Sequence, residues 1–524
     1  MYDYVIVGAG SAGCVLANRL TEDPDVRVLV VEAGPMDESP QIQMPLASGT
    51  VFHTRYDWDF PTETEDRLDD RSLTVPRGKV IGGTSSINGM CYTRGPREDY
   101  DNWASAYGAT GWGYDDVLPY FRRAEGNERG ADAFHGGDGP LTVSDGRSNH
   151  PFSPVFLEAC EQAGLPANDD FNGATWEGVG RYQLMQRDGR RCSNAKAYLH
   201  PVLDRPNLDL VTDSQVLKIL FEGDRAVGVE TFRYNNVQTY RAAREVLVCA
   251  GAIMSPVLLM LSGIGPAAEL APFGIEVRQD LPVGRGLQDH PTCIITFHTE
   301  RESLISAFTP ENVARFETEG RGPLTSNVGE VGGFIRSTPD AEAPDFQIFG
   351  IAAMWRGPNA VTEHGLSMAG YPTKMRSRGR LALRTADPFS KPRMVVNYLS
   401  DERERRVMRE GIRRLMELSE QRAYAGLITK PAFVPASKSD EDVDAFVRKM
   451  VQVSHHHCGT CAINEVVDPE LRVLGVEGLR VIDASVMPEV NQGNTNAPVT
   501  MIGEKGADLV RGIASARPEA AVVA

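Results

Sequence analysis

The sequence contains no long uninterrupted apolar run, and its first residues carry no basic leader. A membrane-spanning helix needs about 18 or more consecutive apolar residues, so we expect no integral membrane segment. The opening "MYDYVIVGAG" leads directly into a β-rich run, without the charged region and cleavage site of a secretory signal. We therefore expect a cytoplasmic protein.

Basic residues are also fewer than acidic residues. The 54 Lys and Arg residues stand against 71 Asp and Glu, which gives a formal net charge of −17. A chain of this charge is a poor partner for nucleic acid or for an anionic membrane surface. We expect no nucleic-acid partner.

Cysteine is uncommon in the sequence, whereas glycine is common. The eight cysteines are scattered, and in a reducing compartment most are expected to be buried free thiols. The 51 glycines are compatible with close approach of the backbone to a ligand. The length of 524 residues indicates two or more domains, or one large α/β core with insertions.

The first forty residues predict a dinucleotide site. The β-rich run that ends at Val7 is followed at once by Gly8-x-Gly10-x-x-Gly13, a helical pattern and a second strand that ends at Glu32. The first glycine permits the tight turn, the second admits a pyrophosphate and the third lets helix and strand pack closely. The helix N-terminus favours the phosphates, and the carboxylate of Glu32 can accept hydrogen bonds from a ribose diol. No Arg follows Glu32, which disfavours a 2′-phosphate cofactor.

Two later stretches favour FAD over NAD. Residues 244–256 are a buried strand that runs into a small-residue turn, and residues 478–488 are another strand with Asp483 at its end. An elongated dinucleotide needs contacts from strands far apart in the chain, and Asp483 could hold the polyol of a flavin. Each stretch alone is equally compatible with an ordinary sheet strand.

The middle of the chain predicts a second, mixed domain. Residues 76–95 form a Gly/Ser-rich loop with cationic ends, which could lie against a ring system and phosphates or simply be a surface loop. Short antiparallel strands are expected at 293–297, 332–335, 345–349 and 380–384, and helices at 401–423 and 441–451. We expect the first domain to be discontinuous, with residues 1–155, 191–290 and 454–524. The second domain is then 156–190 and 291–453.

The segment "VSHHHCGTCAI", residues 453–463, permits three interpretations. Three adjacent histidines on an extended segment point to opposite faces, so they do not readily converge on one metal ion, and we expect no metal. A redox disulfide between Cys458 and Cys461 needs a thioredoxin-like setting, which a Gly-Thr turn between them does not favour. The third interpretation is a general base, since histidine titrates near neutral pH.

Several motifs resemble those of the glucose–methanol–choline (GMC) oxidoreductases over essentially the whole chain. They are "DYVIVGAGSAGCVLANRL…VEAGP", "RGKVIGGTSSINGM" and "GLRVIDASVMPEVNQGNTNAPVTMIGEKGADLV". The resemblance looks closest to the bacterial choline and alcohol dehydrogenase branch. It implies an α/β (α+β) fold with a Rossmann-like FAD-binding domain and an inserted substrate domain on an antiparallel sheet.

The resemblance also implies the site residues. The His-x-x-Gly-Thr motif places the catalytic base on His456, and "QGNTNAPV" places its partner on Asn494. Ile87 stands where some relatives carry a flavin-linked histidine, so non-covalent FAD is expected. The full set of cofactor candidates is Gly8, Gly10, Ser11, Gly13, Glu32, Gly83, Asn88, Val216, Asp483 and Asn496. The substrate candidates are Glu330 and His455.

The expected reaction is oxidation of a primary alcohol, aliphatic or aryl, to the aldehyde. Choline is the alternative, because Glu330 aligns with a position that can supply a carboxylate to its cation, while His455 replaces an aromatic wall. The acceptor is expected to be O₂ or a quinone, and a quinone would bring peripheral contact with the inner membrane. A homodimer is compatible with the family. A lyase or a photodecarboxylase on the same fold is the alternative of another class.

Overall fold

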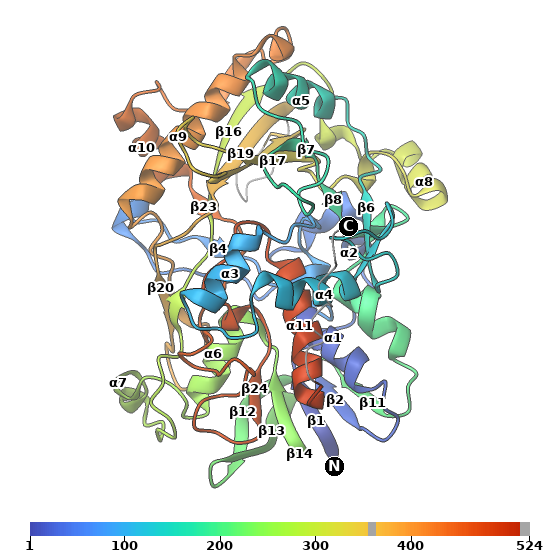
Figure 1. Ribbon diagram of the computed structural model, residues 1–524, viewed down its shortest axis with the longest axis vertical. Coiled ribbons are helices and arrows are strands. Elements are labelled where there is room, and N and C mark those ends of the chain that lie inside the picture. Colours follow the sequence, from blue (N-terminus) through green and yellow to red (C-terminus); the bar gives the residue numbers. More distant parts are fainter. Residues whose placement is uncertain (355–362, 514–524) are drawn as a thin grey trace, which may run out of the picture.

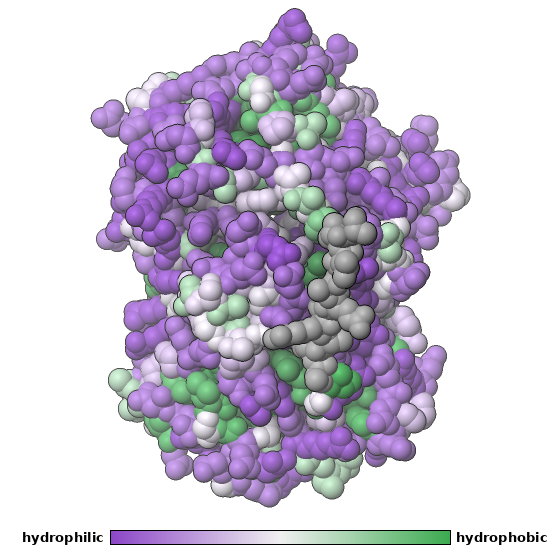
Figure 2. All heavy atoms as spheres, viewed as in Figure 1, coloured by the Kyte–Doolittle hydropathy of each residue, from purple (hydrophilic) through white to green (hydrophobic). Residues whose placement is uncertain are grey.

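The computed structural model describes residues 1–354 and 363–513, which form two halves, each built around a seven-stranded sheet. In Figure 1 the sheet that contains the N-terminal strand lies in the lower half, and the second sheet lies in the upper half beneath α5, α9 and α10. The face shown in Figure 2 is largely hydrophilic, and its apolar patches are small and separate. Within the described residues, no helix is both long and apolar enough to cross a membrane.

The lower sheet combines a parallel part and an antiparallel part. Its strand order is β11-β2-β1-β14-β13-β12, with β24 paired to β14. Strands β11, β2, β1, β14 and β24 are parallel, whereas β12, β13 and β14 form an antiparallel meander. The bounds are β1 Tyr2–Val7, β2 Val28–Val31, β11 Leu208–Val211, β12 Gln215–Glu222, β13 Arg225–Arg233, β14 Asn236–Val248 and β24 Leu479–Val481.

The register of the parallel strands brings three loops to one edge. Val7 at the end of β1 is level with Val31 of β2 and Val248 of β14. These strands end in fully or nearly fully buried valines, as expected for a parallel sheet covered on both faces. Ligands bind at the carboxyl edge of such sheets, so this edge is where a cofactor is expected.

Three helices begin at or near this edge. They are α1 (Ser11–Leu20), which follows β1, α6 (Gly251–Leu261), which follows β14, and α11 (Asn496–Arg511), which follows β24 through a long loop. A Cβ on Gly503 of α11 would lie 3.0 Å from Val15 and 3.1 Å from Ala12 of α1, so glycine permits the close contact between these two helices.

The upper sheet is antiparallel. Its order is β22-β16-β19-β18-β17-β7, with β23 paired to β16. The bounds are β7 Gly178–Arg181, β16 Pro291–His298, β17 Val331–Ile335, β18 Phe346–Ile351, β19 Gly365–Pro372, β22 Lys430–Phe433 and β23 Gln452–Val453. Helices α5 (Phe152–Gln162), α9 (Glu402–Ser419) and α10 (Asp440–Met450) pack against it.

The strands expected at 293–297, 332–335 and 345–349 are thus β16, β17 and β18, and the two expected helices are α9 and α10. The run at 380–384 differs in its partner. As β20 (Gly379–Ala382) it lies in a small sheet with β21 (Arg393–Val395) and β15 (Arg285–Leu287) rather than in the upper sheet. The fold prediction is confirmed, whereas the exact domain boundaries stay a prediction.

Candidate active site

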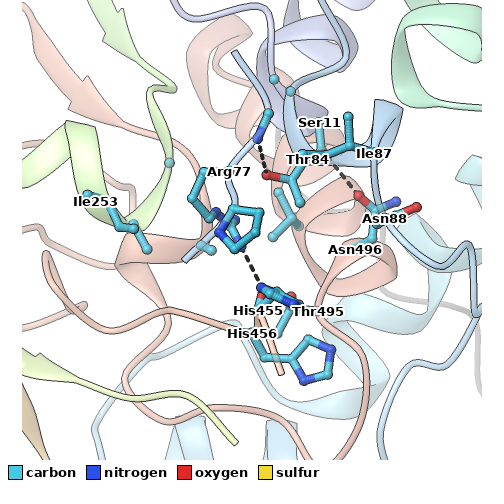
Figure 3. A pocket seen from close by; sticks show the side chains of 18 of the residues that line it. Ser11, Arg77, Thr84, Ile87, Asn88, Ile253, His455, His456, Thr495 and Asn496 are labelled. Atoms are coloured by element: carbon cyan, nitrogen blue, oxygen red, sulfur yellow. Dashed lines mark hydrogen bonds between the residues drawn. The ribbon is translucent and has the colours of Figure 1, made fainter. Parts of the chain in front are cut away.

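A cavity of about 430 Å³ lies between the two sheets. The lower half contributes the ends of β1, β2, β14 and β24, the loop before and after η3 (Gly83–Ser86), and the starts of α1, α6 and α11. The upper half contributes residues of β16, β18, β19 and β23. Figure 3 shows Ser11, Thr84, Asn88 and Asn496 at one side of this pocket, and His455, His456 and Thr495 at another.

The three glycines of the Gly8-x-Gly10-x-x-Gly13 motif meet different structural requirements. Gly8 has φ +99°, the left-handed region that favours glycine. A Cβ on Gly13 would lie 2.0 Å from the carbonyl oxygen of Gly8, so helix and strand could not pack as they do. A Cβ on Gly10 would meet no protein atom closer than the Cys249 carbonyl oxygen at 3.6 Å, and Gly10 lines the cavity. Protein packing therefore requires Gly8 and Gly13, whereas Gly10 leaves room for something in the cavity.

The end of β2 forms one end of the cavity. Glu32 lines it and accepts hydrogen bonds from the backbone N–H groups of Ala9 and Gly34, both at 2.8 Å. Burial raises the pKa of Glu32 to about 7 against the effect of these donors. Val216 and Ser214 line the same region, and the hydroxyl of Ser214 is buried without a partner among the described residues. An orphaned hydroxyl beside a carboxylate suits a polar ligand such as a ribose.

The remaining cofactor candidates also line the cavity. Ser11 donates to Oδ1 of Asn496 at 2.8 Å, which ties the start of α1 to the start of α11 (Figure 3). Gly83 approaches Gly10 so closely that a Cβ on Gly83 would lie 2.9 Å from the Cα of Gly10. Asp483 accepts from Gly251 N–H at 2.8 Å and from the Ser255 hydroxyl.

Asn88 lines the cavity as well, and its Oδ1 accepts from Met90 N–H and from Arg191. Arg191 is buried, and burial lowers its pKa to about 9. It donates to the carbonyl oxygens of Ile42 and Ser85, and so stabilises the Gly/Ser-rich loop.

His456 is held by hydrogen bonds on both ring nitrogens. Its Nδ1 lies 3.0 Å from Nδ1 of His290, and its Nε2 lies 3.2 Å from Nδ2 of Asn494. Nε2 of His290 lies 3.0 Å from the carbonyl oxygen of Thr373, which can only accept. His290 must therefore carry its proton on Nε2 and accept at Nδ1, so His456 carries its proton on Nδ1 and presents an unprotonated Nε2.

The amide of Asn494 is oriented independently and agrees with this tautomer. Its Oδ1 accepts from the hydroxyl of Thr93 at 3.1 Å and from Nε2 of Gln347 at 3.3 Å. Gln347 is itself oriented, because its Oε1 accepts from the hydroxyl of Tyr371. Nδ2 of Asn494 therefore donates toward Nε2 of His456, and the two groups converge on one point of the cavity wall.

Burial keeps the histidines of this site neutral. Burial lowers the pKa of His456 well below 6.5, and the neighbouring His290 and His455 lower it further. Burial likewise lowers the pKa of His290 and of His455 to about 4, although Asp289 opposes both shifts. A neutral imidazole with an unprotonated Nε2 can accept a proton.

The turn that precedes His456 is strained and anchored. His455 has φ +67°, an uncommon conformation for a non-glycine residue. Its carbonyl oxygen accepts from Arg77 at 2.6 Å, and the N–H of His456 donates to Asp289 at 2.5 Å. The ring of His455 lines the cavity, and its Nδ1 is buried without a partner among the described residues.

The rest of the opening motif lies behind this turn. Cys458 and Cys461 are buried free thiols, and burial raises both their pKa values. His457 is buried with Nε2 3.7 Å from Asp289. Over residues 1–354 and 363–513, the group whose ligand atoms lie close enough for a metal is His53, Asp57 and Asp59, not the triple histidine.

Glu330 does not line the cavity, in contrast to its predicted role toward substrate. Its carboxylate accepts from the backbone N–H of His150 and from the hydroxyls of Ser153 and Ser326 at 3.1, 2.8 and 2.7 Å. These three donors hold the carboxylate, and Glu330 is not among the residues that line the cavity. Among the described residues that line the cavity, the carboxylates are Glu32 and Asp483, and both follow strands of the lower sheet.

Sequence reasoning missed four residues that support the catalytic pair. They are Asp289, His290, Gln347 and Thr93. The available signal for the first two was an adjacent Asp-His pair directly before a buried strand, in the run "GLQDHP", residues 286–291. No local sequence pattern marks Thr93 or Gln347 as a functional residue.

The fold and the site together define a flavin-dependent oxidoreductase, and the comparisons agree. Residues 2–292 and 375–503 match the two family models of GMC oxidoreductases, and the chain belongs to this family. It is 44% identical to a mitochondrial choline dehydrogenase of Homo sapiens, over 98% of this chain and 90% of that protein. It is 41% identical to an alcohol dehydrogenase [acceptor] of Pseudomonas putida, over 97% and 96%, and 42% identical to an oxygen-dependent choline dehydrogenase of Brucella anthropi, over 97% and 95%.

Solved structures give the same result. A pyridoxine 4-oxidase from Mesorbium loti has a TM-score of 0.88 at 31% identity and covers 97% of this chain and 98% of its own. A formate oxidase has a TM-score of 0.90 at 28% identity, over 98% of both chains. A fungal aryl-alcohol oxidase has a TM-score of 0.82 at 25% identity, over 97% and 98%. The chain is thus an FAD-dependent oxidoreductase that acts on CH–OH donors, as the sequence predicted.

The residues present fit FAD. The start of α1 has no side-chain cap and no acidic residue in its first turn, so its free N–H groups are available to a pyrophosphate. Gly10 leaves the space that such a group needs, and the orphaned Ser214 hydroxyl lies at the end of the cavity beside Glu32.

Proposed function

We propose that this enzyme oxidises an uncharged primary alcohol, aliphatic or aryl, to the aldehyde, with His456 as the general base and Asn494 as the donor to the substrate oxygen. The observation that carries the proposal is the convergence of an unprotonated Nε2 on His456 with the Nδ2 donor of Asn494, at 3.2 Å from each other. A hydroxyl placed between them can give its proton to the first and accept a hydrogen bond from the second.

Each group in the site has one task in this scheme. His456 Nε2 takes the hydroxyl proton and becomes an imidazolium, which keeps its Nδ1–H directed at His290. Asn494 Nδ2 stabilises the developing alkoxide. The flavin supplies N5 as the hydride acceptor. His290, Gln347 and Thr93 hold the pair in place and do not exchange protons with the substrate.

The charge around the cavity favours an uncharged substrate over choline. A quaternary ammonium needs aromatic faces and a nearby carboxylate. Trp58 lines the cavity, but the ammonium of Lys79 already lies 4.7 Å from the centre of its ring. Arg77 is a cation that lines the cavity itself, and the carboxylate of Glu330 accepts from Ser153 outside the cavity lining.

Most of the wall contributed by the upper sheet is apolar. On β16, β18 and β19 the apolar and aromatic lining residues are Ile294, Phe349, Ile351, Ala369 and Tyr371, while Thr292 and Gln452 add polar groups. Burial of an alkyl or aryl group against such a wall contributes about 25 cal/mol for each Å² removed from water. The unpartnered Nδ1 of His455 offers one hydrogen bond beyond the reacting hydroxyl.

We further propose that FAD is bound non-covalently and that the final electron acceptor is a quinone-type compound or O₂. Ile87 lines the cavity where a covalent link would need a histidine, and a hydrocarbon side chain cannot form one.

The test is an anaerobic titration of the purified holoenzyme with primary alkyl alcohols, benzyl alcohols and choline, followed by admission of air. Flavin bleaching by the uncharged alcohols at lower concentration than by choline supports the proposal. Preferential bleaching by choline would overturn the charge argument. Fast reoxidation in air identifies an oxidase, and slow reoxidation with fast turnover on a quinone identifies a dehydrogenase.

A holoenzyme that no alcohol bleaches would refute alcohol oxidation altogether. Illumination in the presence of a fatty acid, with detection of CO₂, then distinguishes a photodecarboxylase from a lyase.

A further inference from the structure

Asp99 is a buried carboxylate of α3 (Arg97–Ser105) that the proposed reaction does not use. Its exposed fraction is 7%. Oδ2 accepts the backbone N–H of Gln492 at 2.7 Å, and Oδ1 accepts the side-chain Nε2 of the same residue at 2.8 Å. Gln492 lies two residues before Asn494. Asp99 therefore anchors the segment that carries the proposed oxyanion donor.

The same glutamine connects Asp99 to the other member of the pair. Oε1 of Gln492 accepts from the hydroxyl of Thr373 at 3.2 Å. The carbonyl oxygen of Thr373 accepts from Nε2 of His290, which sets the tautomer of His456. Hydrogen bonds thus connect α3 to the general base through Gln492, Thr373 and His290, with the covalent bonds of Thr373 joining its hydroxyl to its carbonyl oxygen.

We propose that Asp99 is a positioning residue whose ionised carboxylate holds Gln492, and through it both Asn494 and His290, in the arrangement that oxidises the alcohol. This proposal rests on the proposed function of His456 and Asn494. An ionised carboxylate accepts both N–H groups of Gln492. A neutral carboxyl group converts one oxygen into an O–H donor, so one of the two contacts is lost. Flavin reduction is therefore faster when Asp99 is ionised.

The groups that face Asp99 place its ionisation in the neutral range. Burial raises the pKa of Asp99 to about 7; the two Gln492 donors oppose this, Glu489 raises the pKa further and Lys374 lowers it. Tyr100 of the same helix stays neutral, because burial raises its pKa well above 10. The pKa of His456 lies well below 6.5, so its titration falls below this range. Burial also raises the pKa of Glu32 to about 7, and the Asp99→Asn variant distinguishes the two carboxylates. The rate of flavin reduction is therefore expected to rise as the pH increases through the pKa of Asp99.

The experiment measures the rate constant of anaerobic flavin reduction by a saturating alcohol, in wild-type holoenzyme and in Asp99→Asn, from about pH 5.5 to 9.5. Asparagine keeps the shape of the neutral acid and cannot ionise. The wild type is expected to show a rise centred near pH 7, and the variant to stay at the low-pH value throughout. At high pH the variant is then slower by about 10-fold, a modest part of what a misplaced catalytic group can cost.

The control is Asp345→Asn. Asp345 is also a partly buried carboxylate with a raised pKa, and its side chain accepts two hydrogen bonds from Ser337, outside the side-chain contacts that join Asp99 to His456. This variant should keep the wild-type profile. A rise near pH 7 that persists in Asp99→Asn overturns the proposal, and failure of any alcohol to reduce the wild-type flavin overturns the proposed function instead.

A second variant covers the case in which Asp99→Asn does not fold. Gln492→Met keeps the backbone N–H that Asp99 accepts and removes the side-chain donor that stabilises the ionised form. The midpoint of the rate profile should therefore move to higher pH. A midpoint that stays in place or moves down contradicts the assignment to Asp99.

Discussion

His456 is fixed as one tautomer by neighbours on opposite sides of its ring. His290 accepts from Nδ1, and the amide of Asn494 points its donor at Nε2. Either neighbour alone would favour an unprotonated Nε2, and together they make the imidazole a base before any substrate arrives. The preorganisation comes from three further residues, Thr373, Gln347 and Thr93, none of which reaches the substrate in the proposed scheme.

We predict that His456→Ala keeps FAD bound and slows anaerobic flavin reduction by about 100-fold or more, the usual scale for loss of a general base. The imidazole contributes through proton transfer, whereas the dinucleotide cradle lies on other elements. Stopped-flow absorbance of the flavin band measures the rate, and the absorbance ratio of flavin to protein measures FAD content. Reduction at the wild-type rate would remove His456 from the mechanism.

At this scale the sequence predicted the residues that belong to short motifs and missed those that do not. His456 and Asn494 are each recognisable from a few neighbours in the chain. His290 meets His456 across 166 residues and Gln347 meets Asn494 across 147, and no local pattern marks such a meeting. Glu330 was assigned to substrate from its place in the chain, but three donors that only the fold brings together hold its carboxylate away from the cavity.

At the scale of elements, the first strand–turn–helix unit is the part whose sequence dictates its structure most directly. Gly8 supplies the left-handed turn, and Gly13 allows α1 to lie against the end of β1. These are backbone requirements, so they were predictable from spacing. The pairing of β20 with β15 was not, because a short β-rich run does not specify which edge it joins.

We predict that Gly10→Ala and Gly13→Ala fail in different ways. The first protein should fold with near wild-type circular dichroism and bind FAD at least about 10-fold more weakly, because the new methyl group points into the cradle rather than into protein. The second should fold poorly, because its methyl group would lie 2.0 Å from the Gly8 carbonyl oxygen. FAD titration by flavin fluorescence, together with thermal melts, separates the two. A Gly10→Ala protein saturated with FAD as purified would show that the pyrophosphate does not approach Gly10.

At the scale of the whole molecule, the cavity is lined by residues of both halves, so a ligand that fills it contacts both. Residues at or just after the ends of β1, β2, β14 and β24 meet residues from β16, β18 and β19 around a single volume. A ligand that fills this volume binds only the folded state with both halves in place, and it stabilises that state by mass action.

We predict that FAD is released by acid precipitation, which leaves a colourless pellet and a yellow supernatant, and that apoprotein melts at lower temperature than holoprotein. FAD at about 1,000 times its Kd adds about 4 kcal/mol to the free energy of unfolding. Differential scanning calorimetry with added FAD measures the recovery, with riboflavin as the control that lacks the phosphates. A yellow pellet would show a covalent link despite Ile87.

Successive positions along two strands of the upper sheet have different roles. On β18, Gln347 holds Asn494, while Phe349 and Ile351, two and four residues further on, line the cavity; on β19, Tyr371 holds Gln347 while Ala369 lines the cavity. Side chains two apart share a face, so one surface carries both tasks at successive positions. Substitutions at Ile351 or Ala369 can therefore reshape this wall of the cavity while the hydrogen bonds that orient the amide stay intact. A single scaffold can in this way acquire new alcohols by changing a few side chains at one end of two strands, and laboratory evolution of specificity should begin there.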